Sequence, residues 1–428
     1  MTNAGPAPQF LARLYQADSE TLAGQTQRWH RLTAEYRRRF DASGVCWFST
    51  PGRTEIGGNH TDHNHGKVLA AAVDLDTIGV AAASRDGTIT VYSEGYAQPF
   101  IVMLDDLSVV PGEQGTTAAL MRGIASRFRQ LGYAIGGFRA CIASDVPVGS
   151  GLSSSASIEV LLATILNVLY NGGKVDGEQI AMIGQYAENV YFGKPCGLMD
   201  QIACAIGGIV KIDFNDPQSP LVEKIDFDFR ASGYCLMVVD TGGSHADLTE
   251  DYASIPREMK SVAARFGREF CRQISEEQLL GKLPELRAQV GDRAILRALH
   301  FLQENQRVDL QVEALRNKDL RSFLQLIEES GASSYKWLQN CVSSRAGTEQ
   351  GIPLALGLAE GFVRKYGGAC RVHGGGFAGT ILAFIPSANV CDFRELMESG
   401  FGSGCVKTLR IRRHGSLEVP GQEGKLSD

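Results

Sequence analysis

Apolar positions along the chain change their spacing from two residues to about 3.6 and back, and each change predicts a boundary between strand and helix. Strands followed by helices, without repeated parallel crossovers, favour an α+β arrangement. The elements expected in the first half are an amphipathic helix within 7–40, strands at 45–50, 68–84, 87–94 and 136–144, and helices at 116–131 and 158–170.

The second half begins with the same mixture and then changes in composition. The expected elements are a helix at 178–193, strands at 207–214 and 234–243, charged helices within 256–338, a helix at 353–366 and a final strand within 370–386. The charged helices predict a second domain with its own scaffold. We therefore expect an N-terminal domain at 1–232 and a C-terminal domain at 233–428.

The most informative junction is DVPVGSGLSSSAS at residues 145–157, here called the glycine-serine turn. It joins a predicted strand to a predicted helix. Gly149 and Gly151 allow a ligand to approach the backbone, and the first amides of a helix attract anions. Ser153, Ser154 and Ser155 add hydroxyls suited to phosphate oxygens or a bound metal. The ordinary alternative is a serine-capped helix after a tight turn.

A second informative stretch is PGRTEIGGNHTDHNHGK at residues 51–67, here called the polar segment. It concentrates charged and polar side chains between glycines, and we expect a loop that composition gives no reason to bury. Such a loop suits recognition of a hydroxyl-rich ligand. His60, Asp62, His63 and His65 are also metal-ligand types, but their spacing lacks a helical i, i+4 pair and no matching cluster lies elsewhere. An ordinary polar surface turn is the third interpretation.

Single residues elsewhere leave two interpretations open. Asp200 lies among apolar neighbours and is either a helix N-cap or a functional acid. Glu188 lies on the preceding helix, where solvent exposure is the ordinary interpretation. Gly374 to Gly376, here called the final glycine loop, indicate either a close backbone approach or a tight turn.

Composition excludes several classes of protein. The 428 residues are 44% hydrophobic and 21% charged, with a net charge of −6, so we expect a soluble protein without general affinity for nucleic acid or anionic membranes. The ten cysteines are scattered without a CxxC pair, which indicates reduced thiols. No apolar run reaches the ~18 residues of a membrane span, and the N-terminus does not resemble a signal peptide. We therefore expect a cytoplasmic protein.

The three stretches together are more specific than any one of them. No GxxxxGK[ST] or kinase HRD and DFG motif is present, and GSGLSS lacks the third glycine of a dinucleotide fingerprint. In order and over nearly the whole chain, PGRTEIGGNHTDHNHG, PVGSGLSSSAS, PCGLMDQ and VHGGGFAGT resemble the motifs of the galactokinase branch of the GHMP small-molecule kinases.

This resemblance implies a two-domain α+β fold, with a ribosomal-protein-S5-domain-2-like N-terminal domain and a ferredoxin-like C-terminal domain with added helices. It implies phosphorylation of the C1 hydroxyl of D-galactose by ATP with Mg²⁺, in a protein we expect to be monomeric. It makes Asp200 the catalytic base, with Arg53 beside it. The implied sugar-binding residues are Arg53, Asn59, His60, Asp62, Gly197, Asp200 and Tyr252, the last lying seven residues after His245. The implied nucleotide-binding residues are Gly149, Ser150, Gly151, Leu152, Ser153, Ser154 and Ser155, with Ser155 and Glu188 on the metal.

Three departures from the family pattern qualify the substrate. Asn59 replaces a glutamate that contacts the sugar C6 hydroxyl, and Glu55 stands where asparagine is usual, so a C6 carboxylate such as that of galacturonate would be better tolerated. The W-x-N-Y pattern near adenine is replaced by GEQGTTAALMRG, which leaves the nucleotide preference open. His373 and Ala378 alter the final glycine motif, where we expect an effect on packing more than on chemistry.

Three other functions stay open at this point. The first is a sugar-1-kinase for galacturonate or another galactose-like sugar. The second is a regulator that binds sugar and ATP without turnover, and the third is a zinc hydrolase built on the histidines of the polar segment. The intact Ser155-Ala156 pair, Asp200 and Arg53 weigh against the regulator.

Overall fold

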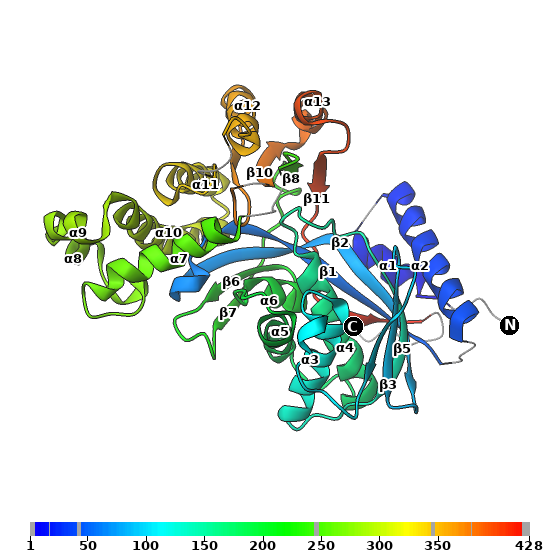
Figure 1. Cartoon of the computed structure of the whole chain (residues 1–428). Coiled ribbons are helices and arrows are strands. Elements are labelled where there is room, and N and C mark those ends of the chain that lie inside the picture. Colours follow the sequence, from blue (N-terminus) through cyan, green and yellow to red (C-terminus); the bar gives the residue numbers. More distant parts are fainter. Residues whose placement is uncertain are drawn as a thin grey trace.

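The computed structural model describes residues 5–16, 18–40, 44–243, 248–343, 347–377 and 379–421, which form two β-sheets covered by helices (Figure 1). An eight-stranded sheet forms the first domain and a four-stranded sheet forms the second. The structure confirms the α+β class and the two-domain organisation. The expected boundary at residue 232 lies in the connection between the two sheets, and its exact position stays a prediction.

The first sheet is built around one long strand, β2, whose two halves pair with different neighbours. Its strands are β1 (Cys46–Gly57), β2 (Lys67–Ser84), β3 (Thr88–Ser93), β4 (Phe100–Met103), β5 (Gly137–Ser144), β6 (Ile209–Asp213), β7 (Leu221–Ile225) and β12 (Leu417–Val419). Their order is β12-β1-β2-β5-β3-β4, and β6 and β7 continue from the other half of β2. Only the β3–β5 pair is parallel among the pairings of the described strands.

Helices cover both faces of this sheet because its strands carry apolar side chains on both sides. Alternation along β2 directs Ile78 and Val80 to the face that packs against α1 (Pro8–Tyr15) and α2 (Ser19–Phe40). Ala81 belongs to the core on the other face. That second face is covered by α3 (Thr117–Gln130), α4 (Ser154–Asn171), α5 (Gly177–Tyr186) and α6 (Met199–Ile206). The predicted helix within 7–40 is therefore two helices.

The second sheet has the order β11-β8-β10-β9 and is entirely antiparallel. Its strands are β8 (Tyr234–Asp240), β9 (Ala369–Val372), β10 (Thr380–Pro386) and β11 (Val406–Leu409). The helices of this domain are α7 (Thr249–Ala264), α8 (Glu276–Gly281), α9 (Leu283–Val290), α10 (Asp292–Arg316), α11 (Leu320–Ser333), α12 (Gly351–Tyr366) and α13 (Val390–Phe401). Helices α12 and α13 pack on one face of the sheet, and α11 packs toward the first domain.

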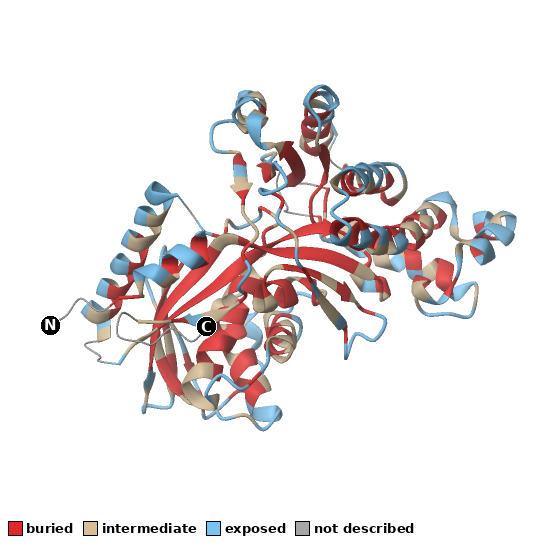
Figure 2. Ribbon diagram, turned by 180° about the vertical axis from the view of Figure 1, so that it is seen from behind, coloured by how far each residue is buried: buried red, intermediate tan, exposed pale blue. Residues whose placement is uncertain are grey.

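A shared apolar core joins the two domains. Ile56, Leu69 and Val73 of the first sheet lie in one cluster with Phe384 of β10 and Phe323 of α11. Most of the large sheet and the facing strands of the second domain are buried, while the outer helix faces are exposed (Figure 2). The chain also returns to the first sheet at its end, because β12 pairs with the free edge of β1.

One expectation about the polar segment is wrong. Residues 51–57 are not an unburied loop, because β1 continues through them to Gly57 and pairs with β2 as far as Leu69. Every residue from 51 to 57 is buried. The charged side chains tolerate this burial because distant elements supply partners: Asp200 for Arg53 and Arg371 for Glu55.

Two expectations from composition have structural counterparts. The ten cysteines have free thiols, and six of them are buried: Cys141, Cys204, Cys235, Cys271, Cys341 and Cys370. Within the described ranges, every helix is too short or too polar to cross a bilayer.

A buried charge network fixes the N-terminal helices and the returning chain to β2. The Asp76 carboxylate is fully buried and lies 2.6 Å from Arg28 of α2 and 3.2 Å from Arg412, which precedes β12. The hydroxyl of Tyr15 also donates to it, at 2.9 Å. Burial alone would raise the pKa of Asp76, but the two arginines lower it. Three distant parts of the chain therefore depend on one ionised side chain.

We expect Asp76→Ala to lower the free energy of unfolding by about 3–5 kcal/mol, because it removes the carboxylate that neutralises buried Arg412 and leaves Arg28 with Asp145 alone, at 3.1 Å. Urea denaturation of the purified variant measures this change. The matched control is Asp105→Ala at an exposed position. A loss no larger than that of the control would contradict the role assigned to the network.

Candidate active site

Asp200 lies at the centre of a polar cluster formed by three elements. It is the second residue of α6, and Leu198 is the N-cap, so the N-cap interpretation of Asp200 does not hold. Its Oδ1 accepts a hydrogen bond from Arg53 Nε at 2.7 Å, and its Oδ2 accepts one from Ser153 Oγ at 2.5 Å. Burial alone would raise the pKa of Asp200, but Arg53 and the Ser153 hydroxyl lower it. Asp200 is therefore ionised, with about a third of its side chain exposed.

The glycine-serine turn is held against β1 by Arg53. The backbone N–H of Arg53 donates to Leu152 O at 3.0 Å, and its guanidinium donates to Gly151 O. Gly149 and Gly151 have φ values of 76° and 70°, a region that favours glycine. Ser153 also has positive φ, at 60°, and immediately precedes α4. The turn thus presents the N-terminus of α4 beside Asp200, as the sequence predicts.

Two carboxylates lie behind the serines of this turn. Ser155 Oγ is 2.6 Å from Glu159 Oε1 and 3.3 Å from Glu188 Oε1, and Gln201 Nε2 donates to both carboxylates at 2.9 and 3.0 Å. Burial and the neighbouring Glu188 raise the pKa of Glu159 to about 8. Lys194 pairs with Glu188 at 3.3 Å.

Solvent exposure, the ordinary interpretation of Glu188, is wrong. The side chain is buried because the six-residue π-helical turn η3 (Ala187–Phe192), which follows α5, brings it to Ser155 and Gln201. Glu159 was not a predicted site residue. It carries the only charge within the apolar stretch 156–170, which is a signal that sequence reasoning could have used.

The end of the polar segment meets the final glycine loop. His60 Nε2 lies 2.8 Å from Gly375 O, and Tyr252 donates from its hydroxyl to Gly376 O at 2.9 Å. Because burial lowers the pKa of His60 to about 4, its ring is neutral, and Nε2 carries the proton that the carbonyl accepts. His245, from which the position of Tyr252 is counted, lies outside the described residues.

Asp62 and Gly197 also meet. Asp62 begins the short 3-10 helix η1 (Asp62–Asn64), and a Cβ atom at Gly197 would overlap its carboxylate. Four predicted sugar-binding residues therefore lie at or near the end of the polar segment. His60 and Tyr252 both contact the final glycine loop, and Asp62 contacts Gly197.

Asn59 has a different environment from these residues. Its side chain is fully buried, and its Nδ2 donates to Glu55 Oε1 at 3.0 Å and to Gly374 O at 2.6 Å. Its Oδ1 accepts hydrogen bonds from Ser334 and Asn340. Every hydrogen-bonding position of this amide is thus used by a protein group, so the predicted contact with the sugar C6 position stays a prediction.

Helix α10 holds the polar segment through two buried side chains that were not among the predicted site residues. His300 Nε2 lies 2.9 Å from Asn59 O, and Glu304 Oε1 accepts from the Gly58 N–H at 3.1 Å. These two residues are four apart and fully buried on one helix face. A histidine and a glutamate on the apolar face of a predicted helix indicate buried polar partners elsewhere in the chain. The sequence did not identify this face, because it depends on how α10 packs against the polar segment.

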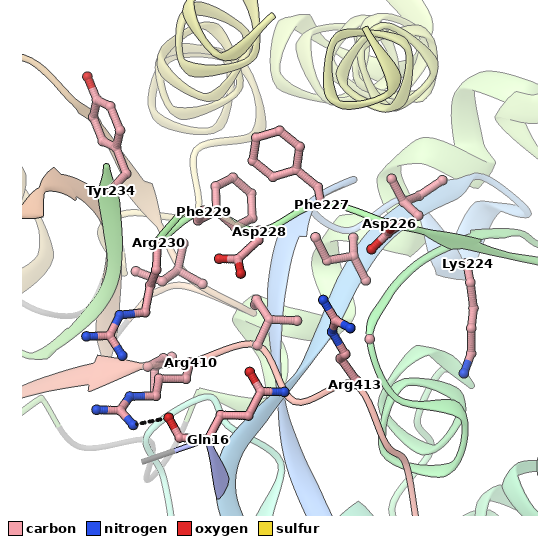
Figure 3. A pocket seen from close by; sticks show the side chains of 16 residues that line it. Gln16, Lys224, Asp226, Phe227, Asp228, Phe229, Arg230, Tyr234, Arg410 and Arg413 are labelled. Carbon is pink, nitrogen blue, oxygen red and sulfur yellow. Dashed lines mark hydrogen bonds between the residues drawn. The ribbon is translucent and has the colours of Figure 1, made fainter. Parts of the chain in front are cut away.

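A cavity of about 260 Å³ lies at the two connections between the domains, and Asp200 is not among its lining residues (Figure 3). Figure 3 shows side chains of the connection 226–230 facing those of the returning segment 409–413. None of the predicted site residues lines this cavity, so the candidate active site is the cluster around Asp200.

The fold and the site together define a GHMP-type small-molecule kinase. Residues 119–208 match the family model of the GHMP kinases N terminal domain, and a mevalonate kinase structure shares the fold at 16% identity, with a TM-score of 0.61 over 87% of this chain and 100% of that one. Residues 34–83 match the galactokinase galactose-binding signature.

The sequence relatives are more specific. The galactokinase of Streptomyces coelicolor is 30% identical over 88% of this chain and 94% of its own length, and that of Glaesserella parasuis is 31% identical over 86% and 92%. A crystal structure of Lactococcus lactis galactokinase complexed with galactose has a TM-score of 0.77 and 25% identity over 90% of this chain and 98% of that one. The chain belongs to the galactokinase family.

The anchoring role of Glu304 predicts a pH dependence of stability. Burial alone would raise the pKa of Glu304, but His300, Arg307 and Arg371 lower it to about 2. Because the pKa of Glu304 is lower in the folded than in the unfolded protein, its ionisation stabilises the fold at pH values above the ordinary glutamate pKa of 4.5. This contribution is lost as the pH falls from 4.5 toward 2. At about 1.4 kcal/mol per pKa unit, the full effect is of order 3 kcal/mol.

We therefore expect the unfolding free energy of the wild type, relative to Glu304→Gln, to fall as the pH is lowered from about 5 toward about 2. Urea denaturation at several pH values measures the difference, with exposed Glu285→Gln as the control. A difference that does not change with pH would mean that Glu304 is not ionised in the folded protein.

Proposed function

We propose that this protein transfers the terminal phosphoryl group of ATP to the C1 hydroxyl of D-galactose, giving galactose 1-phosphate and ADP. The observation that carries the proposal is the arrangement of Asp200, Arg53 and Ser153 at the N-terminus of α4. The two galactokinase relatives and the galactose-complexed galactokinase structure support the choice of sugar.

Asp200 is suited to the role of proton acceptor. An ionised carboxylate with part of its surface exposed can accept the proton of an anomeric hydroxyl, which is more acidic than an ordinary alcohol. Arg53 keeps Asp200 ionised and holds the Gly151 carbonyl, so the acceptor and the phosphate-binding turn are positioned by one guanidinium. Phosphoryl transfer requires such positioning and charge neutralisation more than covalent participation.

The residues behind the turn suit Mg²⁺. A hydroxyl and a buried carboxylate, those of Ser155 and Glu188, lie 3.3 Å apart, and oxygen ligands of this kind are what this cation prefers. Ser155 and Glu188 would hold the ion, which neutralises charge on the nucleotide phosphates when bound. The amides and hydroxyls of residues 149–155 would bind those phosphates.

The sugar would occupy the region bounded by Asp200, Asp62 and His60. Neutral His60, whose Nε2 proton is donated to Gly375 O, leaves Nδ1 as an acceptor, and the Asp62 carboxylate supplies further acceptors for sugar hydroxyls. The lack of a side chain at Gly197 lets the Asp62 carboxylate lie against it. Tyr252 supports the final glycine loop from the other side. This small-molecule partner agrees with a net charge of −6, which provides no basis for nucleic-acid binding.

The direct test is ADP formation from ATP and Mg²⁺ with a panel of D-galactose, galacturonate, arabinose and N-acetylgalactosamine. The proposal requires galactose to be the preferred substrate. A higher kcat/KM for galacturonate would identify the alternative uronate kinase. No sugar-dependent ADP formation with any member would favour the non-catalytic regulator, and stoichiometric zinc in the purified protein would favour the hydrolase.

We expect Asp200→Asn to lower kcat by about 100-fold or more, because an amide of the same shape cannot accept the proton. Galactose binding, measured by calorimetry, should remain detectable. Asp105→Asn at an exposed position is the control. Near-normal turnover of Asp200→Asn would refute its assignment as the base.

We expect Asn59→Glu to be destabilising by itself, because its carboxylate would adjoin that of Glu55, which now accepts from the Asn59 amide. The double variant Glu55→Asn, Asn59→Glu avoids two adjacent carboxylates but moves the carboxylate that pairs with buried Arg371 from position 55 to position 59, so it should recover part of the stability. If residue 59 faces C6, the double variant should also favour galactose over galacturonate more strongly than the wild type does. Urea denaturation and the ratio of kcat/KM for the two sugars measure both effects, and an unchanged ratio would contradict the C6 assignment.

A further inference from the structure

His373 is buried at the point where the final glycine loop meets β1 and the glycine-serine turn. It follows β9, and its exposed fraction is 2%. Its Nε2 lies 3.0 Å from Thr54 Oγ1 and 3.3 Å from the Glu55 backbone nitrogen, and its Nδ1 lies 3.0 Å from Thr380 Oγ1. One imidazole therefore connects the strand that carries Arg53 with the first residue of β10.

The partners of His373 determine where its proton lies. The Glu55 backbone N–H can only donate, so Nε2 must accept. Burial, together with Arg53 and Arg371, lowers the pKa of His373 well below its ordinary value, so the ring is neutral and carries a single proton. That proton is on Nδ1 and is donated to Thr380 Oγ1. The threonine hydroxyl then has its own proton available for another acceptor.

The acceptor is a carbonyl of the glycine-serine turn. Thr380 Oγ1 donates to Ser150 O at 3.2 Å. A continuous, directional series of hydrogen bonds thus runs from the Glu55 N–H through His373 and Thr380 to Ser150 O. All of these groups are buried, so each bond replaces hydration that the group has lost.

This last bond acts on a peptide unit that borders a glycine. The Ser150–Gly151 peptide joins a serine to Gly151, whose φ is 70°, and because glycine is stable at positive and negative φ, the peptide plane on its N-terminal side has more than one accessible orientation. In a trans peptide the carbonyl and the following N–H point in opposite directions. Holding Ser150 O on Thr380 therefore directs the Gly151 N–H away from Thr380.

The His373 ring also limits the turn sterically. A Cβ atom at Gly151 would lie 2.9 Å from His373 Nδ1, so the ring packs directly against this glycine. The carbonyl of Gly151 itself, which belongs to the next peptide unit, accepts a hydrogen bond from the Arg53 guanidinium. The peptide units before and after Gly151 are thus each fixed by a different side chain.

We infer that His373 and Thr380 are positioning residues that hold the Ser150–Gly151 peptide in the orientation that presents the Gly151 N–H to a nucleotide phosphate. This inference rests on the proposed function, in which residues 149–155 bind the nucleotide. His373 then contributes to nucleotide affinity through Thr380 and does not touch the substrate. The presence of histidine at position 373, where the sequence led us to expect an effect mainly on packing, therefore also affects nucleotide binding.

Thr380→Val tests the inference, because valine keeps the shape of threonine and removes only the hydroxyl. We expect the affinity for ADP with Mg²⁺, measured by calorimetry, to fall by about tenfold, and KM for ATP to rise similarly, with little change in kcat. Thr380→Ser restores a hydroxyl and should bind ADP nearly as the wild type does. Galactose affinity should change little in either variant.

A matched control separates positioning from general destabilisation. Thr33→Val removes a similarly buried hydroxyl, which donates to Trp29 O within α2 and accepts from Trp47 Nε1. This control should lower stability without changing ADP affinity. If Thr380→Val weakens ADP binding no more than Thr33→Val, or if Thr380→Ser is as weak as Thr380→Val, the inference is wrong.

The same measurements distinguish the inference from the proposed function. A wild type that binds ADP but phosphorylates no sugar would refute the proposed function, while the ratio of ADP affinities for Thr380→Val and Thr380→Ser would still decide the inference. A wild type that binds no ADP would overturn both.

Discussion

The ion pair between Arg53 and Asp200 is the interaction on which the site depends. It joins β1 to the start of α6, and the same guanidinium holds the Gly151 carbonyl of the glycine-serine turn. Asp200 is the main counter-charge of buried Arg53, and Arg53, assisted by the Ser153 hydroxyl, keeps the pKa of Asp200 low enough for the carboxylate to stay ionised. The reactive carboxylate and the phosphate-binding turn therefore keep a fixed relative position.

The negative charge of three carboxylates near the glycine-serine turn is offset by their neighbours or by protonation. Asp200 has Arg53, Glu188 has Lys194, and Glu159 next to Glu188 has a raised pKa that favours its protonated form. Gln201 bridges the two glutamates through its amide nitrogen. Such pairing limits repulsion between the protein and an incoming polyphosphate, whose charge is also attracted to the N-terminus of α4.

The departures from the family pattern at positions 55, 59 and 373 are connected in space. Glu55 pairs with Arg371 and accepts a hydrogen bond from the Asn59 side-chain amide, so the residues at positions 55 and 59 are adjacent in one buried network. The Glu55 backbone N–H donates to His373, which reaches the turn through Thr380. A carboxylate at 55, an amide at 59 and an imidazole at 373 are thus parts of one interface between the polar segment and the final glycine loop.

The sequence alone determined most helices and strands, the α+β class, the glycine-serine turn before α4 and the motifs of the family, because these depend on local periodicity, on glycine conformation and on residues close together in the chain. Only the tertiary structure decided that β1 continues through residues 51–57, that Glu188 is buried, that Asn59 is enclosed by protein groups, and that His300 and Glu304 anchor the polar segment. The physical reason is that burial of a charged or polar side chain is favourable only with a partner, and these partners lie far away in the sequence: Arg371 is 316 residues from Glu55 and Glu304 is 246 residues from Gly58.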